Sequence, residues 1–163
     1  MKSKNLYLIR HGKAEDHSLL KRDYERNLVE KGRYKSLTIA TKLKDDLSSN
    51  NLLIISSTAN RALQTAEIFC QKIAYPIQDI QLEKSIYEAY HTEILKVINL
   101  VNNDIDNIIV VGHNPGLSDL ANYLCESCIN LNTSHVAKII LPEGFNFSEV
   151  SGGTCHLETV ITG

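Results

Sequence analysis

The chain has 163 residues, of which 43% are hydrophobic and 22% are charged, and its formal net charge is -2. This length favours one domain over residues 1–163, and the composition is that of an ordered globular protein. The near-neutral charge gives no indication of a nucleic-acid or membrane-surface partner. The apolar run at residues 6–9 is too short for a signal peptide or a membrane span, so the cytoplasm is the expected location.

Short apolar runs alternate along the chain with longer segments of helical periodicity. The helix expected at 31–47 places Leu37, Ala40, Leu43 and Leu47 on one apolar face. In chain order, the expected elements are strand 6–9, helix 31–47, strand 52–55, helix 60–73, short strand 80–82, helix 93–101, strand 107–111, helix 117–124, and strands 136–141 and 154–162.

Alternation of strands and helices predicts an α/β sandwich, in which helices flank a mostly parallel central sheet. The last two strands follow one another without a helix between them and predict a C-terminal antiparallel hairpin. In a parallel sheet, ligands bind beyond the carboxyl ends of the strands. That edge is therefore where functional side chains are expected.

Cationic and imidazole side chains follow several of these strand ends. Arg10 and His11 follow the first strand, Arg61 follows the second, and His113 follows the strand at 107–111. The planar fork of donors on arginine matches two phosphate oxygens, and an imidazole can attack phosphorus. The four residues together predict a phosphoryl-transfer site.

The same segments carry a family resemblance. LYLIRHGKAE, SSTANRALQTAEI, IYEAY and VVGHNPGLSDLANYL occur in this order, and each of the RHG, SSTANRALQTA and GHNPGLS motifs follows a strand. The chain resembles the histidine phosphatase superfamily, with its phosphoglycerate mutase-like fold. Within the superfamily it is most similar to the short SixA-type phosphohistidine phosphatases.

The resemblance implies a role for each matched residue. His11 corresponds to the nucleophile that becomes phosphorylated, Arg10 and Arg61 to the phosphate-binding arginines, and His113 to the second histidine of the pocket. Glu88, in IYEAY, is the best match to the acid that protonates the leaving group. The alternatives are a structural turn histidine, a surface arginine, and a solvated or helix-capping carboxylate at Glu88.

Two further residues are expected to contact the phosphoryl group. Gly12 lets the backbone bend or approach a ligand closely. Asn114 lies where a helix begins, and free N–H groups at a helix N-terminus bind anions.

The stretch from Asp23 to Gly32 resembles a D-x-x-R-x-L-T-x-x-G segment of the family, with Val29 in place of threonine. The exchange removes a hydroxyl that could cap the following helix. Arg26 is either a third basic residue near the pocket or a salt-bridge partner of Asp23. Lys13 either faces the substrate or is merely exposed. The remaining histidines are expected to be structural or on the surface: His17, His91, His135 and His156.

Cys125 and Cys128 form a C-x-x-C pair, but no second pair or spaced histidine pair completes a zinc site. The pair also follows an expected helix rather than preceding one, which disfavours a redox motif. Ordinary reduced thiols are expected, and no metal or cofactor is predicted.

The stretch between Arg61 and His113 is short, which leaves no room for an inserted lid subdomain. An open pocket of this kind suits a phosphorylated protein side chain, and the resemblance favours phosphohistidine. The expected function is metal-independent hydrolysis of protein phosphohistidine through an intermediate on His11. The alternatives are a small-molecule phosphomonoesterase of the same superfamily and a non-catalytic phosphoprotein-binding module.

Overall fold

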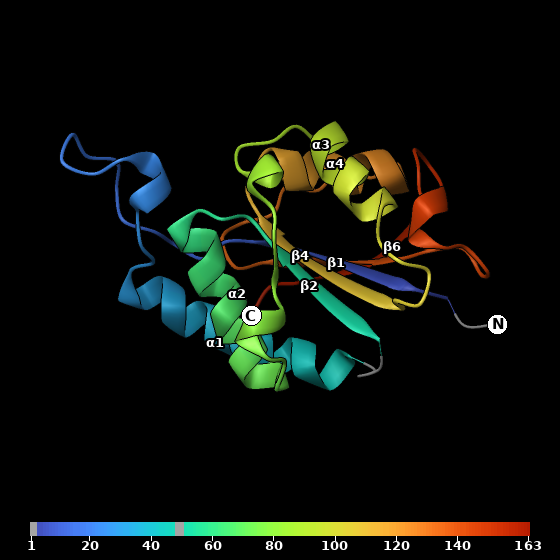
Figure 1. Ribbon diagram of the computed structural model, residues 1–163, viewed down its shortest axis with the longest axis horizontal. Helices are drawn as coiled ribbons and strands as arrows, with labels where there is room; N and C mark the ends of the chain where they lie inside the picture. Colours follow the sequence, from blue (N-terminus) through green and yellow to red (C-terminus); the bar gives the residue numbers. More distant parts are fainter. Residues whose placement is uncertain (1–2, 48–50) are drawn as a thin grey trace.

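The protein is described by a computed structural model that covers residues 3–47 and 51–163. Its centre is a six-stranded sheet with the order β3-β2-β4-β1-β5-β6 (Figure 1). The strands are β1 (Asn5–Arg10), β2 (Leu52–Ser56), β3 (Gln81–Leu82), β4 (Asn107–Gly112), β5 (Val136–Ile140) and β6 (His156–Ile161).

The pairing confirms the predicted mixture of strand directions. β1 and β2 each run parallel to β4, and β3 runs parallel to β2. β5 is antiparallel to both β1 and β6. The fold is therefore an α/β sandwich with a mostly parallel sheet and a C-terminal antiparallel pair, of the phosphoglycerate mutase-like kind.

Helices cover both faces of the sheet (Figure 1). α1 and α2 pack beside each other on one face, and α3 and α4 lie together on the other. The helices are α1 (Glu30–Asp46), α2 (Asn60–Ile73), α3 (His91–Asn99) and α4 (Gly116–Cys125). Four short 3-10 helices join them: η1 (Asp23–Glu25), η2 (Ile77–Asp79), η3 (Lys84–Ile86) and η4 (Phe147–Glu149).

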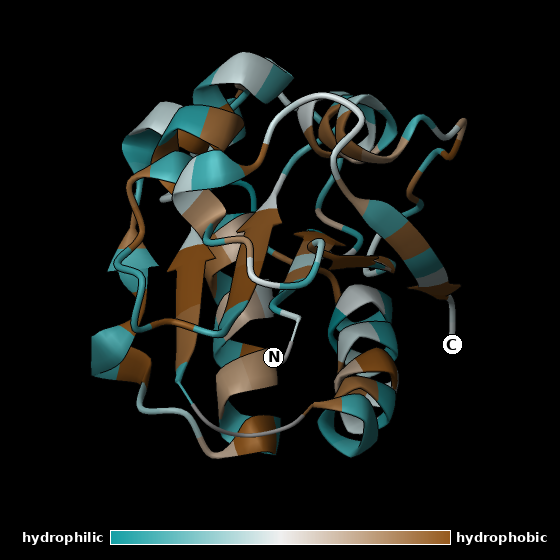
Figure 2. Ribbon diagram, turned by 90° about the vertical axis from the view of Figure 1, so that its right-hand side faces the viewer, coloured by the Kyte–Doolittle hydropathy of each residue, from teal (hydrophilic) through white to brown (hydrophobic). Residues whose placement is uncertain are grey.

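The central strands are apolar on both faces, as expected for a sheet buried between two helical layers. In β1, Leu6 and Leu8 pack with α3 and α4, whereas Tyr7 and Ile9 pack with α1 and α2. The central strands are accordingly brown along their length in Figure 2, and β6, near the C label, alternates between teal and brown. The alternation shows that β6 has one face exposed to solvent.

The predicted apolar face of α1 is wrong at one position. Leu37 is 46% exposed, whereas Ser36, Ile39, Ala40 and Leu43 are buried. Adjacent residues are about 100° apart around a helix, and the side that faces the sheet includes Ser36 instead of Leu37. Ser36 is accommodated there because its hydroxyl is hydrogen-bonded to Ser134 at 2.8 Å.

The N-terminus of α1 shows the expected consequence of Val29. Val29 is the capping residue, and its side chain makes no capping hydrogen bond. Close packing follows at Gly32, where an added Cβ would lie 2.2 Å from the carbonyl oxygen of Lys13. The start of α1 is therefore pressed directly against the segment that follows His11.

Candidate active site

Three parallel strands end at the same edge of the sheet and carry the candidate residues. Arg10 is the last residue of β1 and pairs with Gly112, the last residue of β4. His11 and His113 therefore follow at adjacent strand ends, with ring centroids 5.2 Å apart. Arg61, the second residue of α2, is only 3% exposed. The structure thus brings together the four residues that the sequence predicted to converge.

The hydrogen bonds of His11 determine which ring nitrogen carries the proton. Nδ1 lies 2.7 Å from the carbonyl oxygen of Gly12, and a carbonyl can only accept, so Nδ1 is protonated. In the neutral ring, Nε2 then has a free lone pair. Nε of Arg61 donates toward this Nε2 at 3.4 Å. His11 therefore directs its unprotonated nitrogen at the arginine.

Both histidines have strongly lowered pKa values. Burial lowers the pKa of His11 to about 4, and the positive charges of Arg61 and Arg10 add to this effect. Burial likewise lowers the pKa of His113 to about 3, with contributions from His11 and Arg61. Both rings are therefore neutral at pH 7.

Two buried polar atoms in this cluster lack a hydrogen-bond partner among the described residues: Nε of Arg10 and Nδ1 of His113. The other contacts of the two side chains are satisfied, since Nη1 of Arg10 donates to the Leu131 carbonyl at 3.0 Å and Nε2 of His113 is 2.8 Å from Oγ of Ser57. An unpaired buried polar atom costs about 1–3 kcal/mol. Such atoms are rare in stable cores and are typical of functional sites.

Asp23 anchors the cationic side chains of the site. Its carboxylate accepts hydrogen bonds from Arg61 at 3.0 Å, Arg26 at 2.9 Å and the hydroxyl of Tyr87 at 2.5 Å. Burial alone would raise the pKa of Asp23, but the hydrogen bonds from Tyr87 and Arg26 and the charge of Arg61 together hold it far below its usual range. Asp23 is therefore ionised and fully occupied, which leaves it no proton to donate.

Sequence reasoning left open whether Arg26 lines the pocket or pairs with Asp23, and the structure shows both. It assigned no role to Tyr87 or Ser57. The ring of Tyr87 meets His113 edge-on at 5.4 Å and lies 5.8 Å from the Arg61 guanidinium carbon. Only their positions in the sequence could have indicated these two residues. Tyr87 lies in the IYEAY segment and Ser57 in the SSTAN segment, and both segments carry the family resemblance.

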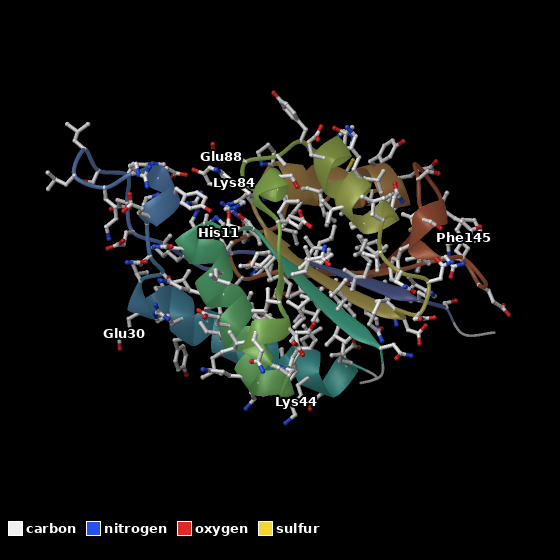
Figure 3. The ribbon with its side chains drawn as sticks, viewed as in Figure 1. His11, Glu30, Lys44, Lys84, Glu88 and Phe145 are labelled. Carbon is white, nitrogen blue, oxygen red and sulfur yellow. The ribbon has the colours of Figure 1, made fainter. Side chains whose placement is uncertain are left out.

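The cluster opens into a pocket of about 410 Å³. Its lining includes the four convergent residues together with Arg26 and Glu88. Glu88 is exposed and has a positive φ of 51°. Figure 3 shows Glu88 above His11 in this view. The pocket thus combines arginines and neutral imidazoles at its base with a carboxylate at its rim.

Lys13 and His17 also line the pocket. Lys13 is both exposed and part of the pocket lining, so a contact with the substrate stays a prediction. His17 is on the surface, as expected, with 78% of its side chain exposed. Its Nδ1 lies 3.5 Å from a carboxylate oxygen of Asp23 at the edge of the pocket.

Gly12 and Asn114 have other partners than a phosphoryl group. The N–H of Gly12 donates to Oγ1 of Thr65 at 2.9 Å, and its carbonyl is occupied by His11. The side-chain amide of Asn114 donates to the Leu131 carbonyl at 2.7 Å, and its oxygen accepts from Ser118 at 2.8 Å. These bonds occupy the polar groups of both residues in the structure, and a phosphate contact at either residue stays a prediction.

Two of the N–H groups in the first turn of α4 are also engaged. The N–H of Leu117 donates to the His113 carbonyl at 3.0 Å, and that of Ser118 donates to Asn114 at 3.2 Å. These bonds fix the loop that carries His113 instead of presenting donors to an anion. The cations for an anion therefore come from side chains.

A larger depression of about 530 Å³ lies between α3 and the β3 edge of the sheet. It is lined mainly by apolar and uncharged side chains, and its one cationic lining residue is Lys96. Volume alone would favour it, but the cationic groups and lowered pKa values lie in the smaller pocket. The smaller pocket is therefore the candidate active site.

Among residues 3–47 and 51–163, no group of three or more histidine, cysteine or acidic side chains is arranged to hold a metal ion. Cys125 and Cys128 are both free thiols, and burial raises the pKa of Cys125 to about 12. In the same part of the chain, no helix has both the length and the apolar character needed to cross a membrane.

Comparison with known families agrees with this geometry. The model of the histidine phosphatase superfamily (branch 1) matches residues 6–92, more than half of the chain. The protein belongs to the histidine phosphatase superfamily. A comparison with curated protein sequences gives no significant match.

Solved structures of SixA proteins share the fold over the whole chain. The SixA protein of Agrobacterium tumefaciens superposes with a TM-score of 0.82 at 23% identity, covering 100% of both chains. The protein histidine phosphatase SixA complexed with tungstate gives 0.80 at 20% identity, covering 97% of this chain and 96% of that one. A phosphoserine phosphatase mutant from Entamoeba histolytica, in complex with phosphoserine, gives 0.67 at 18% identity, covering 97% and 96%.

Proposed function

We propose that this protein is a phosphatase that hydrolyses phosphohistidine on another protein through a covalent intermediate on His11. The observation that carries the proposal is the state of the His11 ring. Its Nδ1 is held protonated by Gly12, its Nε2 lone pair lies 3.4 Å from Nε of Arg61, and its pKa is lowered to about 4. This is a neutral nucleophile beside a cation suited to phosphoryl oxygens.

In the first step, Nε2 of His11 attacks phosphorus, and the bond between phosphorus and the substrate imidazole breaks. The leaving nitrogen takes a proton from Glu88 or from water. His11 becomes a phosphorylated imidazolium, with its Nδ1 proton still donated to Gly12. Arg10, Arg61 and His113 stabilise the charge on the equatorial oxygens, which is the main contribution that phosphoryl transfer requires of a protein.

In the second step, water attacks phosphorus and loses a proton to Glu88 or to solvent. The bond between phosphorus and Nε2 breaks, phosphate leaves, and its electron pair returns to Nε2. The ring regains its neutral form with Nδ1 protonated. Because Nδ1 keeps its proton, the group that leaves phosphorus is neutral imidazole and not an imidazolide anion, so the hydrogen bond to Gly12 is compatible with this step as well as the first.

The substrate class rests on the openness of the pocket. Glu88 and Lys13 at its rim are exposed, so a side chain on a folded protein can reach the base of the pocket. We propose that residues 1–163 form one histidine phosphatase domain without an inserted lid, and that catalysis needs no metal. The tungstate complex of a SixA protein supports oxyanion binding by this fold.

A substrate panel tests the proposal. Free phosphohistidine, a phosphohistidine protein, phosphoramidate and phenyl phosphate are each incubated with the protein, with and without EDTA. Phosphate release from the phosphohistidine substrates, unaffected by EDTA, is expected. Loss of activity in EDTA would overturn the metal-free mechanism.

A small-molecule phosphomonoesterase is the second candidate. Glu88 favours it, because an exposed carboxylate at the rim could protonate an alkoxide leaving group. The phosphoserine phosphatase of similar fold provides a precedent for that chemistry. Faster turnover of a phosphate ester than of phosphohistidine would favour this candidate. Oxyanion binding without turnover of any substrate would instead favour a binding module.

The pH dependence follows from the lowered pKa of His11. A free imidazole loses its nucleophilicity as pH falls through about 6.5. With the pKa of His11 lowered to about 4, the ring stays neutral over the range between these values. The acid limb of kcat/KM is therefore expected near pH 4, once substrate ionisation is corrected for. An acid limb between pH 6 and 7 would contradict a nucleophile whose pKa is lowered by its surroundings.

Glu88→Gln separates the two substrate classes. General acid catalysis contributes about 10²-fold or more when the leaving group is poor, so phenyl phosphate hydrolysis is expected to slow by about that factor. Phosphohistidine hydrolysis is expected to change only a few-fold, because imidazole leaves more easily. Glu93→Gln on α3, outside the pocket, is the matched control. Equal effects on both substrates would remove Glu88 from the mechanism.

A further inference from the structure

The segment at residues 13–22, here called the arm, links β1 to η1 and extends away from the layered body of the protein (Figure 1). Leu19 and Leu20 form its tip. They are fully exposed, at 106% and 97% of the reference area. No other pair of adjacent leucines in the described chain is exposed to this degree. The tip therefore presents two neighbouring apolar side chains to water.

The turn at the tip tolerates leucine but does not require it. Ser18 and Lys21 form an antiparallel bridge that closes a turn with Leu19 and Leu20 as its central residues. Neither leucine has a positive φ, so the turn is compatible with most residue types. Leucine adds no hydrogen bond to such a turn and exposes apolar surface. The two leucines are therefore better explained by contact with another molecule than by the stability of this chain.

The arm is held in place at its base. Glu15 accepts from Nζ of Lys21 and from the N–H of Asn27, each at 2.8 Å. The Glu15 carbonyl accepts from Arg26 at 2.5 Å, and Arg26 is itself bonded to Asp23. The tip is thus positioned by the same network that holds Arg61 in the active site.

The arm is continuous with the candidate pocket. Lys13, Ala14 and His17 belong to the arm and line the pocket. Two residues span at most about 7 Å, so Leu19 lies within that distance of His17 along the chain. A helix is about 10–12 Å across with its side chains. A folded protein that inserts a phosphorylated side chain into the pocket would therefore extend over the tip.

We propose that the arm is a docking element for the phosphorylated substrate protein, and that Leu19 and Leu20 contact an apolar patch next to its phosphohistidine. The inference rests on the proposed function, because the pocket defines where the phosphoryl group enters. Charge favours a protein over a polyanion or an anionic membrane, since Lys13 and Lys21 are offset by Glu15 and Asp16 on the same arm and Arg22 is paired with Glu25.

The test compares two substrates in two variants. The probes are free phosphohistidine and a histidine-phosphotransfer domain phosphorylated with phosphoramidate. L19S/L20S removes the apolar tip, and L100S is the matched control, since Leu100 is 86% exposed and lines the other depression instead of the pocket. Circular dichroism checks that both variants are folded.

The wild type is expected to prefer the phosphorylated domain in kcat/KM. L19S/L20S is expected to lose about tenfold on the domain, through KM, which corresponds to about 1.4 kcal/mol. Its turnover of free phosphohistidine should match that of the wild type, and L100S should match it on both probes. Equal kcat/KM of L19S/L20S and wild type on the domain would overturn the proposal.

Failure of the proposed function is distinguishable, because the wild type would then release no phosphate from free phosphohistidine. The other molecule that could contact Leu19 and Leu20 is a second copy of this chain. Analytical ultracentrifugation tests this alternative. A wild-type dimer that L19S/L20S converts to monomer, with unchanged kinetics on the domain, would assign the tip to self-association and overturn the docking role.

Discussion

His11→Ala is expected to lower kcat/KM for phosphohistidine by at least about 10⁴-fold, equivalent to about 5.5 kcal/mol of transition-state stabilisation. The variant lacks the Nε2 lone pair beside Arg61, so no covalent intermediate can form. The remaining cations can still bind an oxyanion. Vanadate binding, measured by calorimetry, should therefore persist while turnover is lost.

The covalent intermediate provides a second measurement for His11. Rapid quenching with labelled substrate should trap a phosphoenzyme in the wild type that is stable in alkali and labile in acid, as a phosphoimidazole is. The label should be absent from His11→Ala. His156→Ala is the control, because His156 is exposed on β6, outside the pocket. Full turnover in His11→Ala would remove His11 from the nucleophile role.

Arg61→Ala is expected to lower kcat/KM by about 10³-fold, since removing one donor to a developing oxyanion costs about 10²–10³-fold and this donor is charged. Stability should fall as well, because the buried guanidinium bonds to Asp23 through both Nη1 and Nη2. Arg33→Ala, which removes an exposed arginine of α1, is the control for the loss of a charge.

Asp23→Asn distinguishes catalysis from stability at Arg61. This change weakens the anchor of Arg61 but leaves the guanidinium in the site, so it should reduce the melting temperature with a smaller loss of kcat than Arg61→Ala. Arg61→Lys keeps a charge without the planar fork and should recover only part of the activity. If Arg61→Ala and Asp23→Asn lost kcat equally, Arg61 would act only through the fold.

The sequence by itself determined the order and type of the main elements. It also predicted the convergence of Arg10, His11, Arg61 and His113 at one sheet edge. The physical reason is that these inferences use local information. Apolar periodicity reports strand or helix, and parallel strands place their carboxyl ends together wherever the connections are right-handed crossovers.

Only the tertiary structure decided how the hydrogen-bonding groups are distributed among partners. Gly12 and Asn114 lie where the sequence placed them, yet Thr65, His11, Leu131 and Ser118 occupy their polar atoms. Asp23 is far from Tyr87 in sequence, yet their side chains are bonded at 2.5 Å. A donor or acceptor has few bonds to make, and distant segments decide which of them are used.

The same limit explains the error at Leu37. Periodicity shows that a helix has an apolar face but not which edge of that face meets the sheet, and packing placed Ser36 inward and Leu37 outward. The position of His17 beside Asp23 likewise depends on the bonds between Glu15 and Asn27, which fix the base of the arm. The convergence of the four site residues could thus be predicted from the sequence, whereas the surface proposed for the substrate protein could be found only in the folded chain.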